Sequence, residues 1–496
     1  MNKITANLSI LLADFFLVSQ EYDCTITGLA LDSRLVHPGN LFFAYPGYEE
    51  DGRKYIEAAV ANGAVAIVCE GEKVNAFILN NSNVVMFVVP KVAQLVGLIA
   101  AKFYDYPTRK LTVIGVTGTN GKTSITQFIA QIFTDLGQKC GVVGTLGVGF
   151  PNQIKMTGLT TPDAITIQSA LAEFVKEGAK AVAIEVSSQG MAQNRLQGVD
   201  FKIAVFTNLT RDHLDYHKNM QDYAAEKRRL FFTPGLEYAV INTDDEYGVE
   251  LLRSLPLTVK PFAYTTTDVE VNVPQVYAKN IKISPNSFNA EVMTPWGNGV
   301  LQSSLLGRFN VSNLLAVLSV LCISNIELSV VLQHIAQLKN VKGRMQTLGG
   351  GKLPLVVVDF AHTPDALEKS LLALREHCRG KLWCVFGCGG DKDRGKRSLM
   401  GQIAERYSDQ VIITSDNPRS EDPQQISDDI VKGLLCPWAV EVEHDRGVAI
   451  FHAIDCAVQG DVVLLAGKGH EDYQIIGKNK IPFNDVDKAL EALQRK

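Results

Sequence analysis

Apolar residues in this chain form short, uninterrupted runs that alternate with longer amphipathic segments. In the middle of the chain these runs lie at residues 111–116, 180–186, 202–207 and 238–242. Between them, apolar residues at helical spacing predict helices, for example at 124–136 and 165–177. Strands that are apolar throughout and separated by helices indicate a mostly parallel sheet covered by helices.

A second alternation of the same kind begins after a pause near residues 338–344. A helix is expected at 363–377, and strands are expected at 355–359, 382–387, 410–414 and 461–466. This pattern predicts a separate doubly wound, Rossmann-like domain near the C-terminus.

The start of the chain has the pattern of a smaller α/β domain. Short strands are expected at 41–44 and 64–69, with a helix near 55–62. Within residues 1–20 an amphipathic helix is expected, because Asp14 interrupts the apolar run that a signal peptide would need. Pro107 disfavours a helix at the residue before it and suggests a linker. The predicted fold class is therefore α/β with three domains, at residues 1–107, 108–343 and 344–496.

Composition and charge limit the function. Of the 496 residues, 46% are hydrophobic and 20% charged, as in an ordinary globular protein. The net charge of −5 argues against a general polyanion binder, so no nucleic acid is expected as a partner. The 9 cysteines include no CxxC pair, which favours buried free thiols in a reducing compartment over a zinc site. No apolar run reaches the ~18 residues of a membrane span, so a cytoplasmic location without membrane insertion is expected.

The sequence TGTNGKT at residues 117–123 follows a predicted strand and precedes a predicted helix. Glycines let the backbone turn its N–H groups toward phosphate oxygens, Lys122 can neutralise phosphate charge, and the Thr123 hydroxyl can bind Mg²⁺. The strict Walker pattern would place glycine at position 116, which is Val116 here. A structural glycine-rich turn with a surface lysine is the alternative. The order of strand, loop, Lys-Thr and helix favours nucleotide binding.

Two further candidates lie in the same domain. Glu185 ends a predicted buried strand, where open α/β sheets place ligands, and its carboxylate could hold Mg²⁺ near the loop. A capping or surface glutamate is the alternative. Lys227, in a predicted amphipathic helix at 223–231, is an ordinary surface lysine as far as spacing can show.

The segment 212–217 contains two histidines and two aspartates. His213 and His217 are four residues apart, but a zincin would need glutamate at Leu214. Asp215 and His217 are interpreted as solvated loop residues, whereas His213, close to a strand end, is the better ligand candidate.

Several motifs in order make the chain resemble the Mur ligase family of ATP-dependent amide-bond-forming enzymes. They are TGTNGKT at 117–123, EVSS at 185–188, NLxxDHLDxH at 208–217, GxFNxxN at 307–313 and GR at 343–344. The resemblance spans nearly the whole chain. It implies a central P-loop ATPase domain, ATP as a substrate and Mg²⁺ as a cofactor.

The resemblance also implies roles for individual residues. Lys122, Lys227, His213 and Arg344 would be catalytic, with Arg344 reaching the γ-phosphate. One Mg²⁺ would bind Thr123 and Glu185, and a second would bind His213 and a carbamylated Lys227. The remaining ATP contacts would come from Gly118, Thr119, Asn120, Gly121 and Ser124 in the loop, from Asn310 and Asn313 at the adenine, and from Asp359 at the ribose.

C-terminal motifs at 359–364, 387–391, 416–419 and 467–473 resemble those of the family members that add the third residue of the peptidoglycan stem peptide. The implied reaction joins meso-diaminopimelate, through an acyl phosphate, to the D-Glu of UDP-N-acetylmuramoyl-L-Ala-D-Glu. That substrate would contact Leu31, Ser33, Thr160, Thr161, Ser187, Gln193 and Arg195. Diaminopimelate would contact Lys392, Asp416, Asn417, Pro418, Arg419, Gly467 and Glu471. We expect a monomer whose domains close on its substrates.

The choice of amino acid depends mainly on Arg419. Diaminopimelate is lysine with an extra carboxylate, for which a guanidinium is the natural partner. Two positions depart from the family pattern. Lys392 replaces the usual arginine, for which Arg394 is a candidate to compensate, and Gln189 replaces a frequent histidine that we expect to be replaceable.

Four alternatives remain. They are a lysine-adding ligase of the family, a folylpolyglutamate synthetase with the same core, a P-loop switch without ligase activity, and a metallohydrolase built on His213 and His217.

Overall fold

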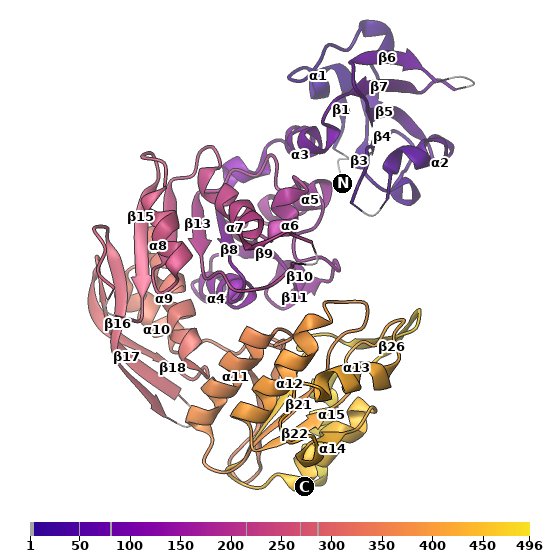
Figure 1. The fold of residues 1–496 in the computed structure, drawn as a ribbon. Coiled ribbons are helices and arrows are strands. Elements are labelled where there is room, and N and C mark those ends of the chain that lie inside the picture. Colours follow the sequence, from indigo (N-terminus) through magenta and orange to yellow (C-terminus); the bar gives the residue numbers. More distant parts are fainter. Residues whose placement is uncertain (1–3, 49, 80–81, 215, 268, 285–286) are drawn as a thin grey trace.

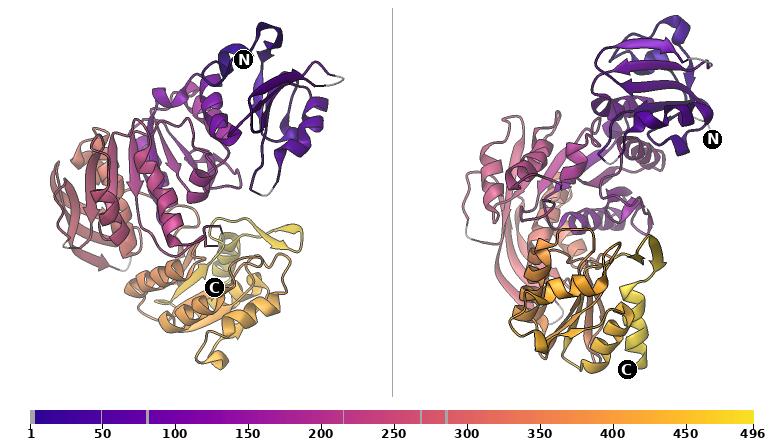
Figure 2. Two further views of the ribbon diagram at one scale, coloured as in Figure 1. Left: turned by 45° about the horizontal axis from the view of Figure 1, so that its top comes forward. Right: turned by 45° about the vertical axis from the view of Figure 1, so that its right-hand side comes forward.

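The protein is described by a computed structural model covering residues 4–48, 50–79, 82–214, 216–267, 269–284 and 287–496. Three α/β units, each with its own sheet, follow one another along the chain, and the central unit joins the other two (Figures 1 and 2). The predicted α/β class with three domains is confirmed.

The N-terminal unit contains a sheet with the strand order β3-β4-β5-β7-β6. Its helices α1 (Leu8–Leu12) and α3 (Val92–Phe103) pack on one face and α2 (Ile56–Ala61) on the other. The strands are β3 (Gly28–Ala30), β4 (Asn40–Ala44), β5 (Ala64–Glu70), β6 (Asn75–Ile78) and β7 (Val85–Val89), and β1 (Ala6–Asn7) pairs with β2 (Thr25–Ile26) beside them.

The amphipathic helix predicted within residues 1–20 is only 5 residues long. Phe15, Phe16 and Val18 pack against the N-terminal core from irregular backbone after the end of α1. Their spacing therefore reflects burial of individual side chains and not a continued helix.

Within the described residues, the central sheet has 11 strands in the order β11-β10-β9-β12-β8-β13-β14-β15-β16-β17-β18. The run from β9 to β16 is parallel, which confirms the predicted parallel sheet, and the outer strands on both sides are antiparallel. The strands are β8 (Thr112–Thr117), β9 (Cys140–Gly144), β10 (Gly147–Phe150), β11 (Gln153–Lys155), β12 (Ala181–Glu185), β13 (Ile203–Phe206), β14 (Tyr238–Asn242), β15 (Lys260–Thr265), β16 (Gln275–Ser284), β17 (Ser287–Thr294) and β18 (Gly297–Ser303).

Helices cover both faces of this sheet. One core contains residues of α4 (Lys122–Asp135), α9 (Arg308–Ile323) and α10 (Leu328–Ile335). The other contains residues of α5 (Ala164–Lys176), α6 (Ser188–Ala192) and α8 (Glu246–Arg253). The predicted helix at 223–231 is α7 (Met220–Arg228) followed by one 3₁₀ turn at Arg229–Phe232. Asp163 caps α5 by accepting hydrogen bonds from two backbone N–H groups, which fixes where that helix begins.

The C-terminal unit is doubly wound, as predicted, with the strand order β19-β20-β24-β21-β22-β23. Its strands are β19 (Gln346–Gly349), β20 (Leu355–Asp359), β21 (Leu382–Phe386), β22 (Gln410–Ile413), β23 (Glu441–Val442) and β24 (Val462–Ala466), with a hairpin of β25 (Tyr473–Ile476) and β26 (Asn479–Pro482). Helices α11 (Pro364–His377), α12 (Gly395–Tyr407) and α13 (Pro423–Val431) pack on one face, and α14 (Arg446–Cys456) and α15 (Asp485–Arg495) on the other.

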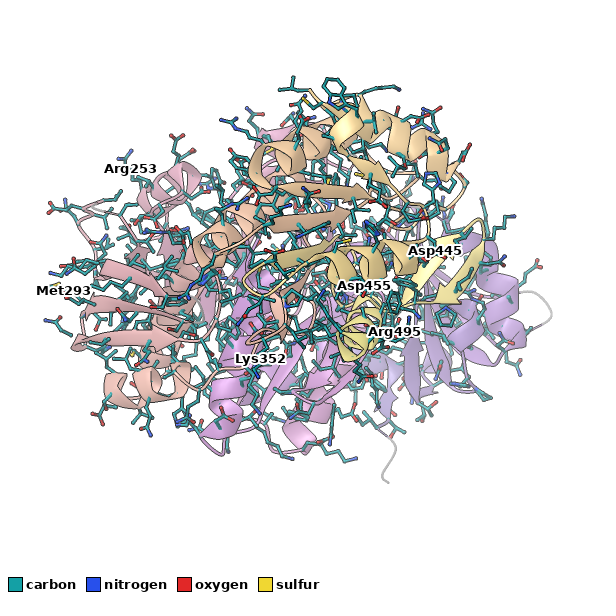
Figure 3. All side chains as sticks on the ribbon, turned by 90° about the horizontal axis from the view of Figure 1, so that it is seen from below. Arg253, Met293, Lys352, Asp445, Asp455 and Arg495 are labelled. Atoms are coloured by element: carbon teal, nitrogen blue, oxygen red, sulfur yellow. The ribbon has the colours of Figure 1, made fainter. Side chains whose placement is uncertain are left out.

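The outer surfaces can be located in Figure 3. Asp455 on α14 and Arg495 on α15 mark the outer helical face of the C-terminal unit, and Arg253 on α8 and Met293 on β17 mark the far edge of the central unit. Five cysteines are buried, but Cys436 and Cys456 are exposed, so the prediction of buried thiols is wrong for these two. No helix in the described ranges is long and apolar enough to cross a membrane.

In the two larger sheets, the carboxyl ends of the parallel strands face one another. Loops at the carboxyl ends of β8, β12 and β13 line a cavity whose lining also includes the loops after β20 and β24, the first turns of α9 and α11, and the segment that joins the two units. In open parallel sheets, ligands bind at this edge. The fold therefore brings two such binding edges to one place, between the central and C-terminal units.

Candidate active site

The predicted phosphate loop joins β8 to the N-terminus of α4 and is braced by the segment after β13. Thr119 donates its backbone N–H to the Asn208 carbonyl at 2.8 Å, and the Asn120 N–H donates to Asn208 Oδ1 at 2.9 Å. Gly118 has φ 140°, and a side chain there would collide with Thr207 Oγ1. Val116 is a buried residue of β8. Gly118, and not residue 116, is the position that lies against Thr207, so glycine is not needed at 116.

Lys122 folds back over its own loop. Its Nζ donates to the Gly118 carbonyl at 2.9 Å and to the Thr119 carbonyl at 2.8 Å. Burial lowers the pKa of Lys122, while Glu185 and Asp212 act in the opposite direction. The ammonium group rests on carbonyls that a bound phosphate could replace as its partner.

Glu185 is the centre of a buried oxygen cluster. Its Oε2 accepts hydrogen bonds from Thr123 Oγ1 at 2.9 Å and Thr145 Oγ1 at 3.0 Å, and its Oε1 accepts from the Thr145 N–H at 2.8 Å. The side chain is 1% exposed, so the alternative of a surface glutamate is wrong. Carboxylate and hydroxyl oxygens side by side are the donor set that Mg²⁺ prefers, so these residues fit such an ion.

Arg344 reaches this cluster from the other side of the cavity. Its Nη2 donates to Thr123 Oγ1 at 3.1 Å, and its guanidinium carbon lies 4.6 Å from the centre of the Phe360 ring. Among the described residues its buried Nε has no hydrogen-bond partner. A buried guanidinium with a spare donor beside a phosphate loop fits a phosphate ligand.

Lys227 is buried, so its interpretation as a surface lysine is wrong. Tyr223, Ala224 and Lys227 share the inward face of α7, and Lys227 Nζ donates to the Gly118 carbonyl at 2.9 Å. Burial, helped by nearby Lys122, holds the pKa of Lys227 well below its usual range. Burial therefore favours the neutral form of this amine.

His213 lies in the wall between this cavity and a second one. Its Nε2 is 3.5 Å from Asp212 Oδ2, and its N–H donates to Asp212 Oδ1 at 2.8 Å. Burial opposes ionisation of Asp212, but His213, His362 and Lys122 act together in the opposite direction and leave the pKa of Asp212 below its usual value.

His217 is buried and hydrogen-bonded through Nε2 to Ser188 Oγ at 2.9 Å, so its interpretation as a solvated residue is wrong. Asp215 lies outside the described residues. In the described ranges, no three His, Cys, Asp or Glu side chains form a metal-binding group, which gives the metallohydrolase alternative no support.

The first cavity has a volume of about 610 Å³, a size typical of ligand sites. It brings together every predicted ATP residue from Thr119 to Ser124, with Asn310, Asn313, Asp359 and Arg344, but Gly118 is not part of its lining. Asn313 Nδ2 donates to Asn310 Oδ1 at 3.0 Å, and Asp359 accepts from the Met345 N–H at 2.8 Å. Burial raises the pKa of Asp359.

A second cavity of about 430 Å³ contains most of the residues predicted for diaminopimelate. Lys392, Asp416, Asn417, Arg419, Gly467 and Glu471 line it, whereas Pro418 is not in its lining. Both cavities share a wall made of Asp212, His213, Phe360, His362 and Glu471.

Arg419 and Arg394 differ in their surroundings. Arg419 Nη1 donates to the Gly390 carbonyl at 2.8 Å at the edge of the second cavity. Arg394 forms an ion pair with Glu421 at 2.9 Å and is not among the residues that line the second cavity.

The residues predicted for the UDP-linked substrate are divided between two units. Thr160 and Ser187 line the first cavity, as does Gln189. Thr161, Gln193 and Arg195 lie behind that wall, where Arg195 donates to the Thr161 carbonyl at 2.7 Å and to Gln193 Oε1 at 2.6 Å. Leu31 and Ser33 belong to the N-terminal unit and belong to neither described cavity lining.

A cross-unit contact at the phosphate loop was not predicted. Asp365, in the first turn of α11, accepts hydrogen bonds through Oδ2 from Asn120 Nδ2 at 2.9 Å and Thr210 Oγ1 at 3.3 Å. Acidic residues are common in the first turn of helices, so the sequence alone carries no signal that this one touches the phosphate loop.

Comparisons with known proteins agree with this geometry. Three family models match the chain: "Mur ligase family, catalytic domain" at residues 25–104, "Mur ligase middle domain" at 116–321 and "Mur ligase, glutamate ligase domain" at 343–469. A protein of Coxiella burnetii named UDP-N-acetylmuramoyl-L-alanyl-D-glutamate--2,6-diaminopimelate ligase is 48% identical over 472 residues, which cover 95% of this chain and 96% of the relative.

A protein of Ectopseudomonas mendocina with the same name is 49% identical over 477 residues, covering 96% of this chain and 97% of the relative. A solved structure of a ligase of that name is similar with a TM-score of 0.68 and 39% identity, covering 95% of each chain.

Proposed function

The chain belongs to the Mur ligase family, and we propose that it joins 2,6-diaminopimelate to UDP-N-acetylmuramoyl-L-alanyl-D-glutamate while ATP is converted to ADP and phosphate. The observation that carries this proposal is the wall shared by the two cavities. The cavity on one side of this wall is lined by a phosphate loop. The cavity on the other side is lined by Arg419, whose guanidinium suits a carboxylate.

The chemistry requires two adjoining sites. A carboxylate is a poor electrophile, so the D-Glu carboxylate first takes the γ-phosphoryl group of ATP, giving an acyl phosphate and ADP. The amine of diaminopimelate then attacks the acyl carbon, the C–O bond to phosphate breaks, and the nitrogen loses a proton. Negative charge accumulates in both steps, and Lys122 and Arg344 are suited to stabilise it.

We propose two Mg²⁺ sites. Thr123 and Glu185 would hold one ion, and His213 and Lys227 the other, with Lys227 carbamylated. Carbamylation needs a neutral amine, whose nitrogen adds to CO₂ and loses a proton, and the lowered pKa of Lys227 supports this. Bound Mg²⁺ would neutralise phosphate charge.

For the amino acid, we propose that Arg419 binds the distal carboxylate of meso-diaminopimelate and that Lys392 adds a point charge. The domains 1–107, 108–343 and 344–496 would hold the uridine end, with Leu31 and Ser33, then ATP, then the amino acid. A monomer in the cytoplasm stays a prediction.

The test is phosphate release with ATP, Mg²⁺ and the UDP-linked dipeptide, comparing diaminopimelate with lysine. Diaminopimelate should be the better substrate, and Arg419→Ala should raise its KM selectively. Arg394→Ala is the matched control, because that guanidinium is paired with Glu421. Equal use of lysine would overturn the specificity, and no ADP formation with either amino acid would overturn the ligase assignment.

A further inference from the structure

Lys468 is a fully buried lysine on the loop that follows β24. Its Nζ donates to Glu471 Oε2 at 2.9 Å and to Asn417 Oδ1 at 3.1 Å. The lysine is not part of the described lining of either cavity. Its Nζ also lies 5.7 Å from the centre of the Tyr473 ring. Any effect on a ligand must therefore act through these neighbours.

Both partners of Lys468 line the second cavity, and Glu471 also lines the first. Asn417 Nδ2 donates to Glu471 Oε2 at 2.9 Å, which closes a triangle of three side chains. The Ile475 N–H, on β25, donates to Asn417 Oδ1 at 3.0 Å and fixes the amide orientation. Within the described part of the chain no hydrogen bond reaches Glu471 Oε1, so this oxygen remains to accept a donor.

Another buried cation of this unit has different partners. Arg446 forms two hydrogen bonds of 2.7 Å with Asp485, a carboxylate that is also fully buried and is absent from the described cavity linings. Such a pair serves the fold. A buried lysine is expensive to desolvate, and an apolar residue of similar size often serves stability as well or better. Lys468 is paired with side chains that face a ligand site, which points to a role in binding.

We propose that Lys468 is a positioning residue for the incoming amino acid. It holds Glu471 and Asn417 in one arrangement, in which Glu471 Oε2 is satisfied internally and Oε1 is left for the ammonium group of the amino acid. It also balances the carboxylate charge, so that Glu471 does not turn toward another cation when the site is empty. This inference rests on the proposed function, because it assigns the second cavity to an amino acid.

The test compares Lys468→Met with Lys480→Met. Lys480 is the matched control, because like Lys468 it lies over the Tyr473 ring, at 3.6 Å from the ring centre, but it is exposed on β26. In the phosphate-release assay, Lys468→Met should raise the KM for diaminopimelate about 10- to 100-fold, the range expected when a charged group loses its hydrogen bonds. The KM values for ATP and the UDP-linked dipeptide should stay within about twofold of wild type, as should all constants of Lys480→Met.

A double-mutant cycle with Glu471→Gln distinguishes positioning from general damage. If Lys468 acts through Glu471, the effect of Lys468→Met should shrink several-fold in the Glu471→Gln background. Additive effects, or an equal rise in all three KM values, would overturn the inference. If Lys468→Met does not fold, as judged by its melting curve, Lys468→Gln keeps a donor for Asn417 and undergoes the same comparison. Failure of the wild-type protein to use diaminopimelate would instead refute the proposed function.

Discussion

The contact between Asp365 and the phosphate loop gives a measurable prediction about how the central and C-terminal units hold together. Asp365→Ala removes the hydrogen bonds from Asn120 at 2.9 Å and Thr210 at 3.3 Å, both of which cross between the units. It also removes the ion pair with Lys369 at 3.0 Å. That pair lies within α11, so its loss affects the open and closed arrangements equally.

The size of the effect follows from the geometry. A hydrogen bond to a charged acceptor contributes about 1.5–3 kcal/mol, and Asp365 is 29% exposed, so the lower end of that range applies to the shorter contact. The longer contact from Thr210 adds a few tenths of a kcal/mol. A total of about 1.5–2 kcal/mol changes the ratio of closed to open molecules about 10- to 30-fold.

The kcat/KM for ATP measures this ratio and should fall about 10- to 30-fold in Asp365→Ala if closure precedes chemistry. Glu376→Ala is the control, because Glu376 on the same helix pairs across the units with Arg308 of α9 at 3.4 Å but is solvent-exposed. Exposed ion pairs contribute about 0–1 kcal/mol, so this variant should lose less than about fivefold. Small-angle scattering should show a larger radius for Asp365→Ala alone. Equal effects of the two substitutions would refute the reasoning.

Three further predictions concern single positions. Gly118→Ala should weaken ATP binding at least about 100-fold in calorimetry, because a side chain at φ 140° collides with the hydroxyl that follows β13. Arg344→Lys, which loses the planar guanidinium and its hydrogen bond to Thr123, should lower kcat about 10- to 100-fold with little change in the melting temperature. Arg397 lowers the pKa of Glu421 to about 2 from 4.5, so the stability that Glu421 contributes is present above about pH 4.5 and is lost as pH falls toward 2. Screening limits it to about 1 kcal/mol. The difference in melting temperature between wild type and Glu421→Gln should become smaller from about pH 7 to about pH 3. A difference that does not change with pH would contradict this sign.

The parallel core could be predicted because its strands are buried on both faces. All five residues of β12 are buried, and so are all four of β13, which leaves no polar alternation that would suggest a different element. The antiparallel strands at the end of the sheet could not be predicted in the same way. β16 alternates between buried and exposed positions, with Lys279 and Asn280 exposed. Such half-exposed segments have no distinctive signal without knowledge of their partners.

The site could be predicted only where a motif carries its own chemistry. The loop from Gly118 to Thr123 is such a case, since its glycines, lysine and hydroxyl fit phosphate without any partner. Lys227 is not, because its burial depends on the carbonyl of Gly118, 109 residues away in the sequence. Asp365 and Asn120 are separated by 245 residues. Local spacing cannot encode contacts of that range, so the sequence leaves Lys227 with its most common interpretation, a solvated surface, and gives no sign of the contact that Asp365 makes.

The wall shared by the two cavities is built from both the central and the C-terminal unit. Asp212 and His213 come from the central unit, whereas Phe360, His362 and Glu471 come from the C-terminal unit. On the proposed function, the acyl phosphate forms on one side of this wall and the amine arrives on the other, and the reacting atoms must come within about 3–3.5 Å of each other. Neither unit alone completes that wall or excludes water from it. On the proposed function, contacts such as the one made by Asp365, which also lines the second cavity, therefore contribute to catalysis by assembling the site.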